Sequence, residues 1–429
     1  MTHLLPRRAL LAAPLLAAPL LAAPGTLRAQ TQARLLVIGG GFGGATAANF
    51  ARRNHPWLDV TLVEPKRHFV TCPYGNLVLA GTRQIGQITH GYDGLRARGV
   101  RVVHDWASGI DAAARRVRLA GGETLTYDRL ILSPGIALRW GAIEGYDEAA
   151  SEIMPHGWVP GEGAQTLLLR RQLEEMPDGG VVGLAIPANP FRCPPGPYER
   201  ISMIASYLKR HKPRSKILAL DAKEAFSKQG LFQDAWAQLY PGMIEWVPGN
   251  RDGRVTRVDA RERVLETEFG TRHRVAVANV IPPQSAARIA IEAGLTDQSG
   301  WAPVNPRSFE SRLAPGIHVV GDANIPGPMP KSGYVANSTA KQAVASAAAL
   351  LRGETPPEAV YFNTCYSHVG EDYGISIVGV FRPNAEGTAI AEVPNSGGVS
   401  PRGNLPENRR LEALHADAWY DSITKDMFA

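Results

Sequence analysis

Three cysteines carry the most distinctive side-chain chemistry of this 429-residue chain. Cys72 lies in the sequence Thr-Cys-Pro-Tyr-Gly, Cys193 in Arg-Cys-Pro-Pro-Gly-Pro, and Cys365 in Asn-Thr-Cys-Tyr-Ser. A thiol can form a disulfide, attack a substrate as a thiolate, or attach to a cofactor. The odd number of cysteines leaves two arrangements open, one disulfide with a spare thiol or three separate roles.

A glycine-rich turn near the N-terminus is typical of a dinucleotide-binding site. The continuous apolar run at residues 35–38 predicts a buried parallel strand. It leads into Gly-Gly-Gly-Phe-Gly-Gly at residues 39–44, and the small residues at 45–51 predict a helix. The start of such a helix carries partial positive charge, which attracts phosphate.

Individual residues of this unit match the requirements of a dinucleotide. Gly39 permits a tight turn, Gly41 lets the backbone approach a pyrophosphate, and Gly44 lets the helix pack closely on the strand. A second predicted strand at residues 59–63 ends in Glu64, 20 residues after Gly44. A carboxylate at that position binds a ribose in such folds, so we expect these residues to bind the cofactor.

Two later strands end in small-residue turns. The first predicted strand, 130–132, precedes Ser-Pro-Gly135, and the second, 316–320, ends in Gly321-Asp322. These turns resemble two further signatures of the glutathione-reductase-like flavoproteins. The resemblance implies that the cofactor is FAD and that Asp322 binds its ribityl chain.

An alanine-rich helix predicted over residues 333–350 would begin at the flavin by the same resemblance. Its positive end would stabilise charge on the reduced ring. Lys331 and Tyr334 are the nearby candidates for cofactor contacts, and the alternative is that either residue only caps or covers the helix.

The region that should bind a nicotinamide dinucleotide lacks the residues for it. A predicted strand at 180–186 is followed by a proline-rich loop at 187–197. Proline donates no backbone N–H and fixes φ, so this loop cannot cradle a pyrophosphate. A predicted helix over 198–209 and a strand over 216–220 retain the βαβ frame. We infer that Cys193 replaces the nucleotide site and that the electrons do not come from NADH.

Three segments carry a more specific resemblance than the glycine turn does. They are Thr71-Cys72-Pro73, Cys193-Pro-Pro-Gly-Pro-Tyr-Glu199, and the tail at residues 363–428. All three are similar to the flavoprotein subunit of flavocytochrome c sulfide dehydrogenase. The likeness runs from about residue 34 to the C-terminus.

This resemblance implies a role for each cysteine. Cys72 would attach FAD covalently through a thioether to the 8α-methyl group of the flavin. Cys193 and Cys365 would form a disulfide over the flavin ring. Glu199 would lie beside the disulfide as a proton acceptor, and Trp419 is the candidate aromatic residue near the flavin.

Each role has a simpler alternative. A bridge between Cys193 and Cys365 would close a long loop and stabilise an exported protein without any part in catalysis. Cys72 would otherwise be a buried, inert thiol, and Glu199 an ordinary acidic residue at the start of a helix. The position of Cys193 at a displaced nucleotide site favours catalysis.

Sulfide is a substrate that suits this chemistry. HS⁻ attacks a disulfide sulfur, which forms a persulfide and releases a thiolate. A thiolate held against the flavin can pass on two electrons, so that oxidised sulfur is released and the disulfide is restored. We expect Cys365 to lie nearer the flavin and Cys193 to take the sulfide.

The elements together predict an α/β fold of the glutathione-reductase-like flavoprotein type, with two Rossmann-like domains and a small α+β domain at the C-terminus. We expect an FAD-binding domain at 34–150 and 283–352, a second nucleotide-domain-like region without the NAD glycine motif at 151–282, and a flavin-covering domain at 357–429. The elements predicted within this last domain are a strand at 375–381, its hairpin partner at 389–393 and a helix at 407–427.

The first thirty residues indicate export. Arg7-Arg8 precedes a stretch rich in leucine and alanine, and Leu27-Arg28-Ala29 is a candidate cleavage site. The paired arginines favour a twin-arginine signal at residues 1–30 and a periplasmic protein, with a Sec signal as the alternative. Removal of the three arginines lowers the formal net charge from +6 to +3, which is too mild for a nucleic-acid partner. No long uncharged apolar run follows, so no membrane span is expected.

The expected electron acceptor is a separate protein. The chain has no Cys-x-x-Cys-His sequence and cannot bind a c-type haem covalently, so we expect a c-type cytochrome subunit in a heterodimer. Two alternatives are a sulfide:quinone oxidoreductase and a non-catalytic, flavin-containing sulfur carrier or chaperone partner. His68, His90 and His368 show no metal-ligand spacing, so no metal is expected.

Overall fold

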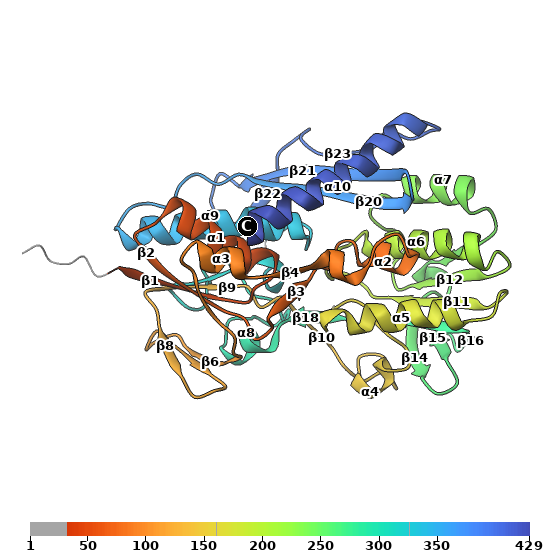
Figure 1. The fold of residues 1–429 in the computed structure, drawn as a ribbon, viewed down its shortest axis with the longest axis horizontal. Helices are drawn as coiled ribbons and strands as arrows, with labels where there is room; N and C mark the ends of the chain where they lie inside the picture. The colour runs from red at the N-terminus through yellow and green to blue at the C-terminus, as the bar shows by residue number, and fades with distance from the viewer. Residues whose placement is uncertain (1–31, 160, 326) are drawn as a thin grey trace, which may run out of the picture. The chain divides into compact units, whose positions relative to one another are not determined.

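The structure is a computed structural model that describes residues 32–159, 161–325 and 327–429 (Figure 1). The predicted signal at residues 1–30 lies outside the described residues. Every element below belongs to the unit Ala33–Ala429. Of the helices that the structure describes, none has both the length and the hydropathy that a membrane span requires.

A five-stranded parallel sheet contains the strands predicted for the FAD-binding domain. In spatial order its strands are β19 (Ile317–Val319), β9 (Arg129–Leu132), β1 (Ala33–Ile38), β2 (Leu58–Val63) and β5 (Arg101–Val103). Helices α1 (Phe42–Asn54) and α9 (Gly333–Leu351) pack against each other on one face of this sheet (Figure 1). The predicted strand–turn–helix unit is therefore confirmed.

The apolar residues of β1 explain its central place. Leu36 and Val37 are at most 2% exposed, and successive side chains of a strand point to opposite faces, so both faces of β1 are covered. Ala45, Ala47 and Ala48 of α1 are fully buried. Their small side chains let α1 lie close to the sheet and to α9, which fixes the glycine turn between β1 and α1.

A second, four-stranded parallel sheet follows. In spatial order its strands are β13 (Ile244–Val247), β12 (Lys216–Asp221), β11 (Val181–Ile186) and β17 (Val277–Val280). Helix α6 (Gly196–His211) connects β11 to β12 and confirms the predicted βαβ frame. It begins two residues before the predicted start, because Pro197 has a fixed φ that suits the first turn of a helix.

Two short strands join the sheets. Strand β10 (Ile136–Leu138) pairs antiparallel with β18 (Gln284–Ala286), at the points where the chain leaves the first sheet and returns to it. The four-stranded sheet falls within the region predicted at 151–282. The exact domain limits stay predictions.

The C-terminal region is built on a long antiparallel hairpin. Strand β21 (Tyr373–Pro383) pairs with β22 (Ile390–Glu392), which confirms the predicted hairpin, and with β23 (Gly398–Val399). Its main partner is β20 (Tyr361–Gly370), which carries Cys365. The sequence did not predict this strand, because its apolar and polar residues come in pairs and do not alternate. Helix α10 (Pro406–Phe428) lies along this sheet and ends near α1 and α3 (Figure 1).

Shorter elements complete the described fold. The helices are α2 (Gly75–Ala80), α3 (Asp93–Ala97), α4 (Glu148–Ser151), α5 (Ala164–Glu175), α7 (Gln229–Leu239) and α8 (Arg288–Glu292). The strands are β3 (His68–Val70), β4 (Thr89–Gly91), β6 (Ala107–Asp111), β7 (Arg116–Leu119), β8 (Thr124–Thr126), β14 (Val255–Asp259), β15 (Val264–Thr267) and β16 (Arg272–Arg274).

Candidate functional site

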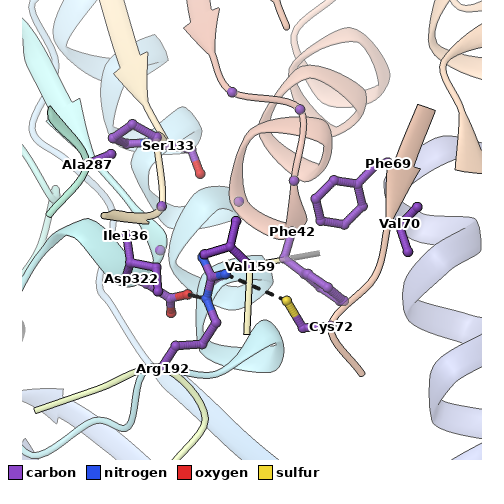
Figure 2. A pocket seen from close by; sticks show the side chains of 18 of the residues that line it. Phe42, Phe69, Val70, Cys72, Ser133, Ile136, Val159, Arg192, Ala287 and Asp322 are labelled. Atoms are coloured by element: carbon purple, nitrogen blue, oxygen red, sulfur yellow. Dashed lines mark hydrogen bonds and ion pairs between the residues drawn. The ribbon is translucent and has the colours of Figure 1, made fainter. Parts of the chain in front are cut away.

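A cavity of about 580 Å³ opens at the carboxyl ends of β1, β9 and β19. This edge of a parallel sheet is where ligands bind in open α/β folds. In Figure 2, Cys72, Arg192 and Asp322 point toward one another within it. The predicted site residues that line the cavity are Gly39, Gly41, Glu64, Cys72, Gly135, Cys193, Glu199, Gly321 and Asp322.

The glycine turn leaves no room for side chains. Gly39 has a φ of +93°, and a Cβ atom there would lie 2.2 Å from the carbonyl oxygen of Ser133. A Cβ atom on Gly44 would lie 1.7 Å from the carbonyl oxygen of Gly39, which confirms the close packing expected of this residue. Gly41 provides no side chain to cap α1, so the first N–H groups of the helix are available to a phosphate.

Glu64 ends β2 as predicted, and its carboxylate faces the glycine turn. Its Oε2 accepts a hydrogen bond from the N–H of Gly40 at 2.7 Å, and its Oε1 accepts one from the N–H of Lys66 at 3.0 Å. The buried hydroxyl of Tyr92 donates to the carbonyl oxygen of Gly40 at 3.2 Å. These contacts hold Glu64 at the cavity wall, where it can bind a ribose. The glycine turn and Glu64 thus fit the dinucleotide part of FAD.

Arg192 connects Asp322 with Cys72 and was not among the predicted site residues. Its Nε donates to Asp322 Oδ2 at 2.6 Å, and its Nη1 lies 3.6 Å from Cys72 Sγ (Figure 2). Burial raises the pKa of the Cys72 thiol, and the Arg192 guanidinium opposes that rise. Asp322 therefore lines the cavity with its carboxylate paired to an arginine, and its contact with the ribityl chain stays a prediction.

Lys331 fixes the loop that contains Asp322. Its Nζ donates to the carbonyl oxygens of Asp322 at 2.9 Å and Asn324 at 2.5 Å. The ammonium lies 3.6 Å from the ring centroid of Trp301. Burial lowers the pKa of Lys331 to about 8. This lysine thus holds the backbone at the floor of the cavity.

Cys193 lies in the loop between β11 and α6, and Cys365 lies on β20. Cys193 has a φ of +56°, and its N–H donates to the carbonyl oxygen of Lys331 at 2.7 Å. Burial raises the pKa of the Cys193 thiol, and negative charge on Cys365 raises it further. Both are free thiols in the described chain, so the disulfide and the order of the two cysteines relative to the flavin stay predictions. Cys193 lines the cavity, whereas Cys365 is not among its described lining residues.

Glu199 lies in the first turn of α6, beside both cysteines. Its Oε2 accepts a hydrogen bond from Asn76 Nδ2 at 2.8 Å, and its Oε1 accepts one from the N–H of His368 at 2.9 Å. The carboxylate therefore joins α2, α6 and β20. Its negative charge raises the pKa of Cys193 and Cys365, after the larger effect of burial.

Three predicted cofactor-binding residues, Gly44, Tyr334 and Trp419, are absent from the described cavity lining. Tyr334 lies in the first turn of α9, and Trp419 packs into a hydrophobic cluster beside α2. The next residue, Tyr420, reaches the Cys72 loop instead. Its ring stacks on Tyr74 with the centroids 4.3 Å apart, and its hydroxyl lies 2.9 Å from Thr71 Oγ1. The flavin contacts of Tyr334 and Trp419 stay predictions.

Three family models match the chain. Residues 33–155 match pyridine nucleotide-disulphide oxidoreductase. Residues 166–282 match the central part of the sulfide dehydrogenase [flavocytochrome c] flavoprotein chain, and residues 357–428 match the flavin-binding part of flavocytochrome c sulphide dehydrogenase. The matches cover strands of both parallel sheets and the C-terminal hairpin.

Solved structures share this fold. The sulfide:quinone oxidoreductase of Aquifex aeolicus is 18% identical, with a TM-score of 0.68 over 92% of each chain. Putidaredoxin reductase, in its covalent complex with putidaredoxin, is 15% identical, with a TM-score of 0.62 over 90% of this chain and 94% of that chain. The predicted fold class is confirmed.

The amino-acid sequence is also similar to those of curated sulfide oxidoreductases and sulfide dehydrogenases. The mitochondrial sulfide:quinone oxidoreductase of Mus musculus is 24% identical over 312 residues, which are 70% of this chain and 67% of the relative. The sulfide dehydrogenase [flavocytochrome c] flavoprotein chain of Chlorobaculum thiosulfatiphilum is 58% identical over 45 residues, which are 10% of this chain and 94% of that sequence. The predicted resemblance is thus confirmed, and the chain belongs to the family of the flavoprotein chain of flavocytochrome c sulfide dehydrogenase.

Proposed function

We propose that this chain oxidises sulfide with FAD and a redox-active disulfide between Cys193 and Cys365, and that it passes the electrons to a separate c-type cytochrome. The place of Cys193 carries the proposal. This cysteine lines the same cavity as the glycine turn and Asp322. It also follows β11 at the carboxyl edge of the second parallel sheet, where such folds bind their ligands.

The cavity residues that would hold FAD divide by the part of the cofactor they suit. The glycine turn and the start of α1 would bind the pyrophosphate, and Glu64 would bind a ribose. Asp322 would bind the ribityl chain. When bound, FAD supplies a two-electron acceptor that can return its electrons one at a time.

Cys193 would take the sulfide, because it lines the cavity. Attack of HS⁻ on its sulfur breaks the disulfide, so that Cys193 becomes a persulfide and Cys365 leaves as a thiolate with the bonding electron pair. The disulfide would form again when the outer sulfur leaves as zero-valent sulfur, a two-electron oxidation for which the bound FAD would supply the acceptor. Glu199, fixed by Asn76 and His368, would accept the proton that the sulfide loses.

Cys72 would carry FAD covalently. Its thiol lies 3.6 Å from the guanidinium of Arg192, which would stabilise the thiolate that forms the thioether. The hydrogen bond to Asp322 holds the Arg192 guanidinium in position. Asp322, Arg192 and Cys72 would thus act together in the attachment of FAD.

Two candidate functions differ in the electron acceptor, which is a c-type cytochrome in one and a quinone in the other. We propose a c-type cytochrome subunit as the acceptor, which the family supports, and a periplasmic location after twin-arginine export, which the paired arginines at residues 7 and 8 support. A quinone is the second candidate, since the relative from Mus musculus and the similar structure from Aquifex aeolicus are sulfide:quinone oxidoreductases.

An anaerobic titration of the purified flavoprotein, followed by flavin absorbance, tests the proposal. Sulfide should bleach the flavin at about one equivalent per FAD, whereas NADH should leave it oxidised. Bleaching by NADH alone would contradict the proposal. A flavin that neither reagent bleaches would favour the sulfur-carrier alternative.

A further inference from the structure

One buried lysine next to the two cysteines has no role in the reaction described so far. Lys228 immediately precedes α7 and is only 7% exposed. Its Nζ donates to the carbonyl oxygen of Cys365 at 2.9 Å and to Ser367 Oγ at 2.8 Å. Both acceptors are neutral, and they lie on β20, the strand that brings Cys365 to the site. The ammonium is therefore fixed beside Cys365 without a direct carboxylate partner in the described chain.

The backbone of Lys228 is itself unusual. Its φ is +62°, in the left-handed region that a residue with a side chain seldom adopts. Such conformations persist where the surrounding structure enforces them, and they concentrate at functional sites. In this case the conformation directs a charged side chain away from solvent and onto β20.

Several groups near Lys228 can carry negative charge. Burial lowers the pKa of Lys228, while Cys365, Glu199, Cys193 and Glu412 each oppose that change. Glu199 is already bonded to Asn76 and His368. Glu412 Oε2 is bonded to Ser400 Oγ at 2.7 Å. A thiolate at Cys365 would be a further anion beside Lys228, whose ammonium has no carboxylate within ion-pair distance in the described chain.

We infer that Lys228 is a positioning residue of the sulfide reaction, which holds β20 at Cys365 and stabilises the negative charge on its sulfur when the bond to Cys193 breaks. The inference rests on the proposed function. In the described chain Lys228 is not part of the cavity lining, so it would act on the sulfur and not on the substrate or the cofactor. Removal of its charge should raise the pKa of Cys365 and slow the step in which this cysteine leaves.

The thiol can be measured without sulfide. The reduced holoprotein is alkylated with iodoacetamide over a range of pH, and the rate at Cys365 is read by peptide mass spectrometry. Lys228→Gln keeps hydrogen-bond donors but removes the charge. The midpoint of the alkylation rate at Cys365 against pH should therefore rise by about one pH unit. Lys228→Arg keeps the charge and should leave the midpoint near that of the unchanged protein. Flavin reduction by sulfide should be about tenfold slower in Lys228→Gln only.

Two controls separate charge from packing. Lys223→Met removes another buried lysine, whose Nζ bonds to Asp221 at 2.6 Å, and should not move the midpoint. Ser367→Ala removes one acceptor and leaves the charge, and should not move it either. An unchanged midpoint in Lys228→Gln, or an equal shift in Ser367→Ala, would overturn the inference.

Failure of the two proposals can be told apart. If Lys228→Gln does not fold, Lys228→Arg tests the inference instead. A higher alkylation midpoint in Lys228→Arg, which keeps the charge, would also overturn the inference. If the midpoint moves as expected and sulfide does not reduce the flavin of the unchanged protein, the proposed function fails and the effect of Lys228 on the thiol stands.

Discussion

Single charged residues decide how the cysteines of this site can react. Burial raises the pKa of Cys72, Cys193 and Cys365, which favours inert thiols at neutral pH. Arg192 opposes the rise at Cys72, and Lys228 opposes it at the other two cysteines. Each cation is held in place by hydrogen bonds, so the two reactive positions have separate and fixed sources of positive charge.

Replacement of Arg192 should impair the covalent attachment of FAD. In Arg192→Gln the Cys72 thiol keeps its burial and loses the nearby cation, so about tenfold less flavin should remain on the chain after acid precipitation. Cys72→Ser should release all of it. Because the pKa of Cys72 is raised, attachment to the apoprotein should become faster as the pH rises. Retention of flavin by Cys72→Ser after acid treatment would contradict the tether.

The roles of Arg192 and Lys228 were not predicted from the sequence. Cysteine contexts and the glycine turn are local patterns, so they could be read from neighbouring residues. Contacts between Arg192 and Asp322, or between Lys228 and Cys365, join segments that are more than a hundred residues apart. Only the fold brings them together, although the position of Arg192 directly before Cys193 was a local signal that could have been used.

At the scale of elements, periodicity and turn chemistry predicted the parallel sheets well. Strands β1, β9, β11 and β12 contain continuous apolar runs, because both faces of a parallel sheet are covered. Strand β20 was missed because its apolar and polar residues do not alternate as they do in a typical half-buried strand. The buried hydroxyl of Ser367 bonds to Lys228, and the backbone N–H of His368 bonds to Glu199; a strand pattern reveals neither contact.

The glycine turn gives a prediction about one element contact. In Gly44→Ala the new Cβ would meet the Gly39 carbonyl oxygen at 1.7 Å, so α1 must move away from β1. The free energy of unfolding should fall by about 1–3 kcal/mol, and the FAD content of the purified protein should fall with it. Gly86→Ala is the matched control, since no heavy atom lies within 4 Å of its Cβ position. A Gly44→Ala variant that is purified with its full FAD content would contradict the role of this turn in binding FAD.

The end of α10 gives a prediction with a pH dependence. Asp426 accepts a hydrogen bond from Asn337 at 2.8 Å and pairs with Lys341 at 2.6 Å, and both residues belong to α9. Burial opposes the charge of Asp426, yet these contacts hold its pKa below the ordinary value of 3.8. A lowered pKa stabilises the fold above pH 3.8, and this contribution is lost as the pH falls through the folded value.

Asp426→Asn should therefore destabilise the protein by about 1–2 kcal/mol at pH 6, measured by urea unfolding. The difference from the unchanged protein should shrink at pH 3. Asp421→Asn, on the exposed face of the same helix, is the control and should change little at either pH. An Asp426→Asn effect that is equal at both pH values would show that charge is not the cause.

At the scale of the whole molecule, the account requires an outlet for electrons. Three regions, the two parallel sheets and the C-terminal hairpin, meet at or next to one cavity, and each supplies one of the three cysteines or the residues that hold it. Protein reduced by sulfide should be reoxidised by ferricytochrome c at least about tenfold faster than by a soluble ubiquinone analogue, since one-electron transfer to a haem needs no quinone pocket. Preference for the quinone would favour the second candidate function.

The most direct test compares the unchanged protein with Cys193→Ser and Cys365→Ser in an anaerobic sulfide titration followed by flavin absorbance. All three should contain FAD, because the glycine turn and Cys72 are intact. The account predicts bleaching in the unchanged protein and a rate at least about a hundredfold lower in each variant, since a disulfide needs both sulfurs. Flavin that sulfide bleaches equally fast in all three proteins would contradict the central claim.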